Sequence, residues 1–338
     1  MKAVRFHEHG GLDVLSYEDV ADPEPASGEV LIKVRACALN HLDLWQRRGI
    51  PGVPLPHCPG SDVAGEVVRG EAPGVAEGLR VMLQPGISCG RCGACLGGQD
   101  NLCRSYGLVG HHSEGGYAEF VTVPVENLIP IPDRIGFVDA AAFPLTFLTA
   151  WHMLVTRAQL RPGETVLVLA AGSGVGQAAI QVARAQGARV IATAGSAEKL
   201  ARARQLGAHI GIDHYRDDIA KEVRVFTDRR GVDVVVEHVG QSTWEQSIKS
   251  LRRGGRLVTC GATTGPGGAV DIRHLFTRQI SLIGSYMGSK GELLQAADLF
   301  FDGEFGPVID RTYSLEAAAE AQHRLEDQAQ FGKIVLEL

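Results

Sequence analysis

The sequence lacks any long apolar run. Its most hydrophobic stretches, such as VLVLAA at residues 166–171, are far shorter than the roughly 20 residues that cross a bilayer as a helix. The opening MKAVRFHEHGG is charged and has no apolar core of about 7 residues or more, which a secretory signal requires. We therefore expect no membrane span, no secretory signal and a cytoplasmic location.

The chain also lacks an excess of basic residues. It has 33 Lys and Arg against 39 Asp and Glu, a net charge of −6, and its basic residues occur in short pieces such as LRRGGR at 251–256. A nucleic-acid-binding surface needs concentrated positive charge, so we expect a small-molecule partner and no nucleic acid. With 338 residues, of which 45% are hydrophobic, the chain is long enough to bury the cores of two domains.

The hydrophobic pattern changes along the chain. Up to about residue 125, short alternating runs such as EVLIKVRA (29–36) lie between turn residues, which is typical of β-strands. From about residue 137, strands alternate with helices, which predicts a parallel sheet with right-handed crossovers. We expect an α/β protein with a Rossmann doubly wound parallel sheet at 129–284 and a β-rich domain formed by 1–128 and 285–338. The closing FGKIVLEL (331–338) has the pattern of an edge strand.

A glycine-rich turn lies between the first strand and helix of the second domain. AAGSGVG (170–176) directly follows the strand-like ETVLVLA and opens the helix-like GVGQAAIQVARAQGA. Small residues let the backbone approach a pyrophosphate, whose charge then lies at the helix N-terminus. This context predicts a dinucleotide site with contacts from Gly172, Ser173, Gly174, Val175 and Gly176, and the alternative is a tight turn that binds nothing.

The end of the second strand bears on the choice of nicotinamide cofactor. In IATAGSAEK (191–199), Ala194 and Gly195 stand where an acidic residue would bind the ribose hydroxyls of NAD. Ser196 and Lys199 offer a hydroxyl and an ammonium to a 2′-phosphate, so NADP(H) is favoured over NAD(H). Two alternatives stay open. Ser196 could only cap the helix while Lys199 is a solvated charge, and Glu198 could reach a ribose hydroxyl.

Four of the seven cysteines are spaced C-x2-C-x2-C-x7-C, at Cys89, Cys92, Cys95 and Cys103. Four thiolates without a further ligand describe a closed tetrahedral zinc site, which is structural rather than catalytic. We predict one structural Zn²⁺ per subunit at these residues.

Together these features resemble the medium-chain dehydrogenase/reductase superfamily, which includes zinc alcohol dehydrogenases and quinone oxidoreductases. The resemblance covers essentially the whole chain. It implies that the β-rich part is a GroES-like catalytic domain with a zinc lobe at about 86–106, whose four cysteines match the family's structural-zinc ligands one for one. It also implies a homodimer or homotetramer, since ISLIGSYM (280–287) resembles the family's sheet-extending edge strand.

The family's catalytic zinc ligands do not carry over to this sequence. By the same resemblance, the three ligand positions fall on Asn40, Ser61 and about Leu145, and the hydroxyl used for proton relay falls on Leu42. This departure makes a catalytic zinc at these positions unexpected. A rearranged site built from nearby donors is the alternative, and these donors are His41, His57, Cys58 and Asp62.

An asparagine in place of the zinc cysteine resembles the zinc-free quinone oxidoreductases, whose enzymes pass hydride from NADPH to a quinone or an α,β-unsaturated carbonyl. Asn40 would donate a hydrogen bond to the acceptor oxygen, and the candidate catalytic residues are Asn40, Asp43 and Ser61. The resemblance adds three cofactor contacts: His41 at the pyrophosphate, Thr149, and Tyr215 beside the 2′-phosphate.

Three functions therefore stay open. The favoured one is a zinc-binding, NAD(P)H-dependent reductase of quinones or α,β-unsaturated carbonyls. The second is a zinc-type alcohol dehydrogenase, because the zinc lobe is more typical of that branch. The third, from a different class, is an NADPH-binding redox sensor without turnover.

Overall fold

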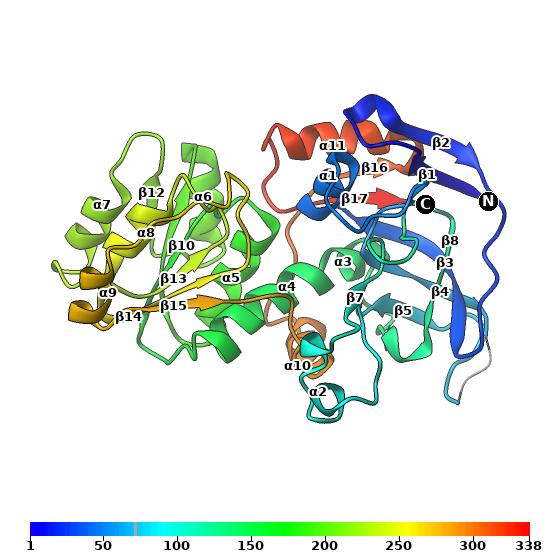
Figure 1. The fold of residues 1–338 in the computed structure, drawn as a ribbon, viewed down its shortest axis with the longest axis horizontal. Coiled ribbons are helices and arrows are strands. Elements are labelled where there is room, and N and C mark those ends of the chain that lie inside the picture. The colour runs from blue at the N-terminus through cyan, green and yellow to red at the C-terminus, as the bar shows by residue number, and fades with distance from the viewer. Residues whose placement is uncertain (71–72) are drawn as a thin grey trace. The chain divides into compact units, whose positions relative to one another are not determined.

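The computed structural model describes residues 1–70 and 73–338, and Figure 1 traces the chain. By its internal contacts the chain divides into two units, Met1–Leu145 with Ser289–Leu338, and Thr146–Gly288. The sequence expectation divided it earlier, after residues 128 and 284. The difference at the first boundary arises because α3 (Phe137–Ala142) packs on strands β3, β4 and β17 of the first unit.

The first unit contains a seven-stranded sheet with the order β16-β17-β3-β4-β5-β9, in which β8 also pairs with β3. Its strands are β3 (Glu29–Ala38), β4 (Asp62–Arg69), β5 (Arg80–Leu83), β8 (Phe120–Pro124), β9 (Leu128–Pro130), β16 (Ile309–Ser314) and β17 (Lys333–Glu337). A separate antiparallel pair joins β1 (Lys2–Phe6) to β2 (Leu15–Asp19), and a second short pair joins β6 (Gly86–Ile87) to β7 (Gly107–Leu108).

Helices of the first unit are α1 (His41–Arg48), α2 (Gly93–Leu96), α3, α10 (Lys290–Phe301) and α11 (Ala318–Glu326). α4 (Pro144–Trp151) begins in this unit and continues in the second, where a π-helical turn over His152–Arg157 follows it. Short 3-10 turns lie at Leu12–Val14, Asp100–Leu102, Val125–Asn127 and Leu315–Ala317.

The expectation that the C-terminal strand lies at a sheet edge was wrong. β17 pairs in parallel with β16 on one side and antiparallel with β3 on the other, so it is an internal strand. The residue pattern of FGKIVLEL does not show how many strands pair with it, because its second partner, β16, comes from a separate segment of the chain. As a result the first residue of the strand, Lys333, is buried.

The second unit is built on a six-stranded parallel sheet with the order β12-β11-β10-β13-β14-β15. The strands are β10 (Thr165–Val168), β11 (Arg189–Ala194), β12 (Ile210–Asp213), β13 (Val232–Glu237), β14 (Leu251–Thr259) and β15 (Ser281–Gly284). The helices are α5 (Gly174–Ala185), α6 (Ala197–Gln205), α7 (Ile219–Phe226), α8 (Trp244–Ser250) and α9 (Ile272–Arg278). This confirms the predicted Rossmann sheet.

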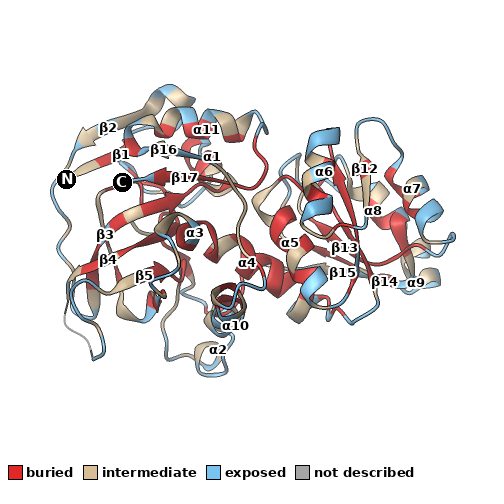
Figure 2. Ribbon diagram, turned by 180° about the vertical axis from the view of Figure 1, so that it is seen from behind, coloured by how far each residue is buried: buried red, intermediate tan, exposed pale blue. Residues whose placement is uncertain are grey.

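The strand order of the second unit positions its ligand site. The order reverses between β10 and β13, and ligands of such sheets bind beyond the carboxyl ends of the strands at that reversal. The central strands are buried along their whole length, as the red strands in Figure 2 show. Buried β-branched runs such as Val234–Val236 explain why the sheet is parallel and covered. Within the described residues, no helix has both the length and the apolar character needed to span a membrane.

Candidate active site and cofactor site

Asn40 lies two residues after the end of β3 and is the N-cap of α1. Antiparallel pairing of β3 with β4 aligns Ala38 with Asp62, which brings the first residue of β4 beside Asn40. The Nδ2 atom of Asn40 donates to Oδ2 of Asp62 at 2.9 Å. Both side chains are buried. Sequence reasoning named Asn40 as a catalytic candidate, and Asp62 as a residue that orders the cleft or, less favoured, as a ligand of a rearranged metal site.

A lysine that sequence reasoning missed contacts both Asn40 and Asp62. Lys333 Nζ lies 2.7 Å from Oδ1 of Asn40 and 2.9 Å from Oδ2 of Asp62. The exposed fraction of the side chain is 2% for Lys333 and 0% for Asp62, so the ion pair is shielded from water. The signal in the sequence was a lone lysine inside the apolar run of FGKIVLEL. We call Asn40, Asp62 and Lys333 the ammonium network.

The ammonium network includes one of the three residues, Asn40, onto which the sequence resemblance maps a catalytic zinc ligand, and Asp62 directly follows the second, Ser61. Ser61 is buried, and its Oγ has no hydrogen-bond partner among the described residues. Leu145 contributes its backbone N–H, which donates to Oδ1 of Asp62 at 2.8 Å. A divalent cation beside a buried ammonium, without thiolate or imidazole ligands, is electrostatically unfavourable. The residues present do not fit a catalytic zinc.

The donors considered for a rearranged zinc site do not gather either. His57 Nε2 lies 3.0 Å from the carbonyl oxygen of Gly110. Cys58 Sγ contacts the carbonyl oxygen of Gly115 at 3.5 Å. Within residues 1–70 and 73–338, the one group of three or more His, Cys, Asp or Glu side chains spaced for a metal is the four-cysteine cluster. The structure therefore gives the rearranged site no support.

Asp43 is buried and supports Asn40 through its backbone. Its Oδ2 accepts hydrogen bonds from the backbone N–H of Asn40 at 2.8 Å and from the Tyr117 hydroxyl at 3.2 Å. Oδ1 has no partner among the described residues. Burial raises the pKa of Asp43 to about 7, against the opposing effect of the hydrogen bond from Asn40.

This shift predicts a pH dependence of stability. The folded state holds the Asp43 proton up to about pH 7, whereas the unfolded chain releases it near its ordinary pKa of 3.8. The folded state thus binds more protons in this window, and the free energy of unfolding should fall as the pH rises from about 4 to 7, by on the order of 4 kcal/mol from this group. Asp43→Asn should remove that fall in urea unfolding measured at pH 5 and pH 8.

The matched control for this measurement is Asp302→Asn, which removes an exposed carboxylate of the same unit. It should keep the pH dependence of the unchanged protein. Equal pH dependence in Asp43→Asn and in the unchanged protein would contradict the raised pKa of Asp43.

The four predicted zinc ligands lie together. Their Sγ atoms are all within 4.8 Å of one another, with 3.9 Å between Cys89 and Cys95 and 3.5 Å between Cys92 and Cys95. Thiolates around one zinc lie about 3.8 Å apart, given a Zn–S distance near 2.3 Å. Backbone N–H groups of Arg91 and Cys92 lower the pKa of Cys89 to about 6, which favours the thiolate. These residues fit a closed zinc site.

The turn after β10 has the geometry that the glycine motif predicts. Ser173 caps α5, and its Oγ accepts a hydrogen bond from the backbone N–H of Gly176 at 2.9 Å. A Cβ on Gly176 would lie 2.3 Å from the carbonyl oxygen of Ala170, so only glycine fits there. Gly174 and Val175 form the first turn of α5, next to Gly172 and Ser173, and the free N–H groups of this helix end can bind a pyrophosphate.

The end of β11 lacks an acidic residue, as the sequence indicated. The strand ends at Ala194, and no carboxylate occupies residues 194–196. Tyr215 lies against Gly195, where an added Cβ would be 2.3 Å from its Cε2, and the residue is 76% exposed. Ser196 caps α6 by accepting from the backbone N–H of Lys199 at 3.2 Å, as the capping alternative anticipated. The capping bond leaves the Ser196 hydroxyl hydrogen available to a phosphate.

Two further predicted cofactor contacts lie on different elements. His41 is the first residue of α1, with its ring centroid 6.3 Å from that of Trp45. Thr149 is buried on α4. Their roles stay predictions.

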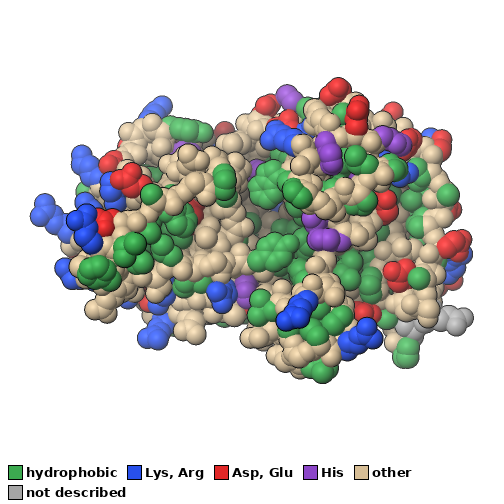
Figure 3. Space-filling view, viewed as in Figure 1, with side chains coloured by type: hydrophobic (Ala, Val, Ile, Leu, Met, Phe, Trp, Pro, Cys, Tyr) green, Lys and Arg blue, Asp and Glu red, His purple; other side chains and the backbone are tan. Residues whose placement is uncertain are grey.

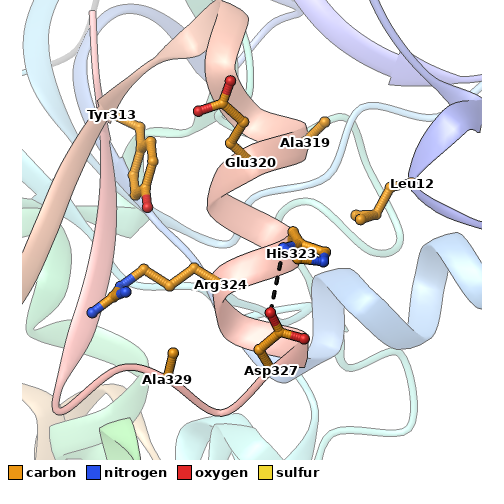
Figure 4. A pocket seen from close by; sticks show the side chains of 8 residues that line it. All are labelled: Leu12, Tyr313, Ala319, Glu320, His323, Arg324, Asp327 and Ala329. Atoms are coloured by element: carbon orange, nitrogen blue, oxygen red, sulfur yellow. Dashed lines mark ion pairs between the residues drawn. The ribbon is translucent and has the colours of Figure 1, made fainter.

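A surface pocket of roughly 490 Å³ lies elsewhere in the first unit. Figure 4 shows it between α11 and neighbouring segments, with the ion pair of His323 and Asp327 at 3.4 Å on its wall. None of the predicted site residues lines it, and His323 and Asp327 are more than half exposed. We therefore place the candidate chemistry at the ammonium network and not in this pocket.

Two family models match this chain. The model described as the alcohol dehydrogenase GroES-like domain matches residues 26–133, and the one described as the zinc-binding dehydrogenase matches residues 174–302.

Known proteins resemble the chain over its whole length. A quinone oxidoreductase of Mus musculus is 34% identical over 99% of this chain and 97% of its own. An acryloyl-coenzyme A reductase of Metallosphaera sedula is 34% identical over 99% of both chains. A crystal structure of an NAD-dependent alcohol dehydrogenase matches with a TM-score of 0.97 and 47% identity over 100% of both chains.

Proposed function

The chain belongs to the medium-chain dehydrogenase/reductase superfamily, and from this premise we propose that it is an NAD(P)-dependent oxidoreductase that reduces a quinone or an α,β-unsaturated carbonyl. The observation that carries the substrate class is the ammonium network, in which Asn40 stands where the resemblance places a zinc-binding cysteine and is bonded to Asp62 and Lys333. Relatives named quinone oxidoreductase and acryloyl-coenzyme A reductase agree with this class.

The chemistry needs polarisation of an acceptor oxygen. When bound, the reduced nicotinamide supplies a hydride, which adds to the electrophilic carbon conjugated with the acceptor carbonyl, and a proton from water completes the reduction. Negative charge develops on the carbonyl oxygen during this step. One N–H of the Asn40 amide donates to Asp62, and the other has only a long contact of 3.5 Å to the carbonyl oxygen of Ala38. That second N–H is suited to donate to the acceptor oxygen.

For the cofactor we propose NADP(H) over NAD(H). The support is local: no carboxylate follows β11 at 194–196, and Ser196, Lys199 and the exposed Tyr215 ring surround this strand end. Burial lowers the pKa of His214, the charge of Asp213 raises it, and the charge of Lys199 lowers it, which indicates that the Lys199 ammonium is close to this strand end. A cation and hydroxyl donors favour a 2′-phosphate.

For the metal we propose one structural zinc per chain, held by the four cysteines. The lobe that carries them is short of buried apolar residues, since Leu96 and Leu102 are largely exposed. A thiolate-bound zinc compensates for the missing core. A second, catalytic zinc is not part of the proposal, because Asn40, Ser61 and Leu145 offer no thiolate or imidazole ligand and a lysine is buried against Asn40.

We further propose a cytoplasmic homodimer or homotetramer. β15 pairs only with β14 among the described strands, which leaves its other edge open for pairing with a second copy. Hydrophobic side chains gather on the face of the second unit near α9 in Figure 3, where Ile272 and Phe276 are exposed.

The test is a turnover assay of the purified protein with NADPH and NADH against a quinone and an enone, and with the oxidised cofactors against a simple alcohol. We expect reduction of the quinone or the enone with kcat/KM higher for NADPH than for NADH, and no steady oxidation of the alcohol. Alcohol oxidation abolished by a chelator that leaves the fold intact would favour a zinc-type alcohol dehydrogenase. NADPH binding without turnover of any substrate would favour a redox sensor.

A further inference from the structure

Lys333 belongs to the candidate site, but no motif in the sequence predicts it there. It lies at the start of the internal strand β17, where its exposed fraction is 2%. A lysine side chain is costly to bury unless its charge is paired and its N–H groups find acceptors. Both conditions hold here, since Asp62 provides the opposite charge at 2.9 Å and Asn40 a neutral acceptor at 2.7 Å.

The ammonium also fixes which way the Asn40 amide faces. An ammonium group donates hydrogen bonds and accepts none, so the Asn40 atom 2.7 Å from Lys333 Nζ must be the carbonyl oxygen. The amide nitrogen is then held on the other side, where one of its hydrogens goes to Asp62 at 2.9 Å. The second hydrogen has no acceptor closer than the carbonyl oxygen of Ala38 at 3.5 Å among the described residues.

Of the three residues of the ammonium network, Asn40, the proposed hydrogen-bond donor to the substrate, is the most exposed. Asn40 is 7% exposed, whereas Lys333 and Asp62 are 2% and 0% exposed. Asn40 is therefore the member of the network most accessible to a substrate oxygen. A hydrogen bond from a cation to an amide oxygen polarises the amide, which makes its N–H groups stronger donors.

We propose that Lys333 is a positioning residue for hydride transfer, which orients and polarises the Asn40 amide so that this amide, rather than a metal ion, stabilises negative charge on the acceptor oxygen. The inference rests on the proposed function. Asp62 balances the charge of the buried lysine.

The test separates this role from a purely structural one by removing both charges together. Lys333→Met alone leaves Asp62 as a buried unpaired carboxylate, so we expect it to unfold more easily. The double variant Lys333→Met/Asp62→Asn leaves no unpaired charge, and we expect it to fold with a melting temperature close to that of the unchanged protein. Its kcat for the quinone or enone should fall about 100-fold, the size of effect that removal of an oxyanion donor has.

Two further readouts distinguish positioning from general damage. The affinity for NADPH should be unchanged in the double variant, and the kinetic isotope effect with NADPH deuterated at the transferred hydride should rise, because hydride transfer becomes rate-limiting. Lys33→Met is the matched control, since Lys33 is an exposed lysine on β3 of the same sheet. It should leave kcat, affinity and isotope effect unchanged.

The possible failures are distinct. If the unchanged protein reduces its substrate and the double variant loses less than tenfold in kcat, Lys333 is only structural and the inference is overturned. If the unchanged protein reduces neither quinones nor enones, the proposed function fails, and the inference fails with it because Lys333 has no reaction to assist.

Discussion

Replacing Cys95 by serine should remove the zinc and disorder the lobe around it. The unchanged protein should contain one zinc per chain by elemental analysis, and Cys95→Ser should contain none. Closed thiolate sites contribute on the order of 10 kcal/mol to the order of the segments that they join. The lobe has little else to hold it, because α2 has four residues, none of them buried.

The consequence of losing zinc should be local at first. One contact that ties the lobe to the rest of the first unit is the bond from the Lys290 backbone N–H to Asp100 Oδ1 at 2.9 Å. Without metal, we expect protease cleavage within about residues 86–106, a lower melting temperature and retained NADPH binding by the second unit. Cys260→Ser is the control and should keep one zinc. Two zinc ions in the unchanged protein, or one in Cys95→Ser, would contradict the proposed structural site.

Gly176→Ala should weaken NADPH binding at least 100-fold. The new Cβ would lie 2.3 Å from the carbonyl oxygen of Ala170 and 2.9 Å from Ser173 Oγ, far inside the van der Waals limit. The first turn of α5 must shift to relieve this contact, which moves the N–H groups that bind the pyrophosphate. The dissociation constant, measured by NADPH fluorescence, reports this loss directly.

The control for Gly176→Ala is Gly291→Ala on α10, where the nearest atom to an added Cβ is Ser289 Oγ at 3.9 Å, an ordinary van der Waals distance. This variant should keep the NADPH affinity of the unchanged protein. Circular dichroism on both variants checks that the fold is intact. A folded Gly176→Ala protein with less than a threefold loss of affinity would show that the turn does not bind the pyrophosphate.

The structure changes how the missing zinc ligands are understood. In the sequence, Asn40, Ser61 and Leu145 are three separate replacements. In the structure, Asn40 and the backbone of Leu145 both bond to Asp62, and Lys333 bonds to Asn40 and Asp62. These residues form one connected hydrogen-bond network around a buried lysine, so the replaced positions Asn40 and Leu145 are joined through Asp62.

The zinc cluster and the nucleotide turn could be predicted because each depends on residues that are close together in the sequence. The spacing of the four cysteines and the turn AAGSGVG each lie within a short segment, so the residues that act together are also neighbours in the chain. The alternation of strands and helices likewise reports the burial of each element and predicted the parallel sheet of the second unit. For these features the sequence by itself determined the fold class, the zinc cluster and the nucleotide turn.

The ammonium network was decided only by the tertiary structure. Lys333 and Asn40 are 293 positions apart, and they meet because β17 inserts between β16 and β3. Strand pairing depends on backbone hydrogen bonds and on the packing of whole sheets, which the pattern of one strand does not encode. A lysine on an edge strand would face water, whereas the same lysine on an internal strand beside Asp62 becomes a buried charge, and that difference gives the site its candidate chemistry.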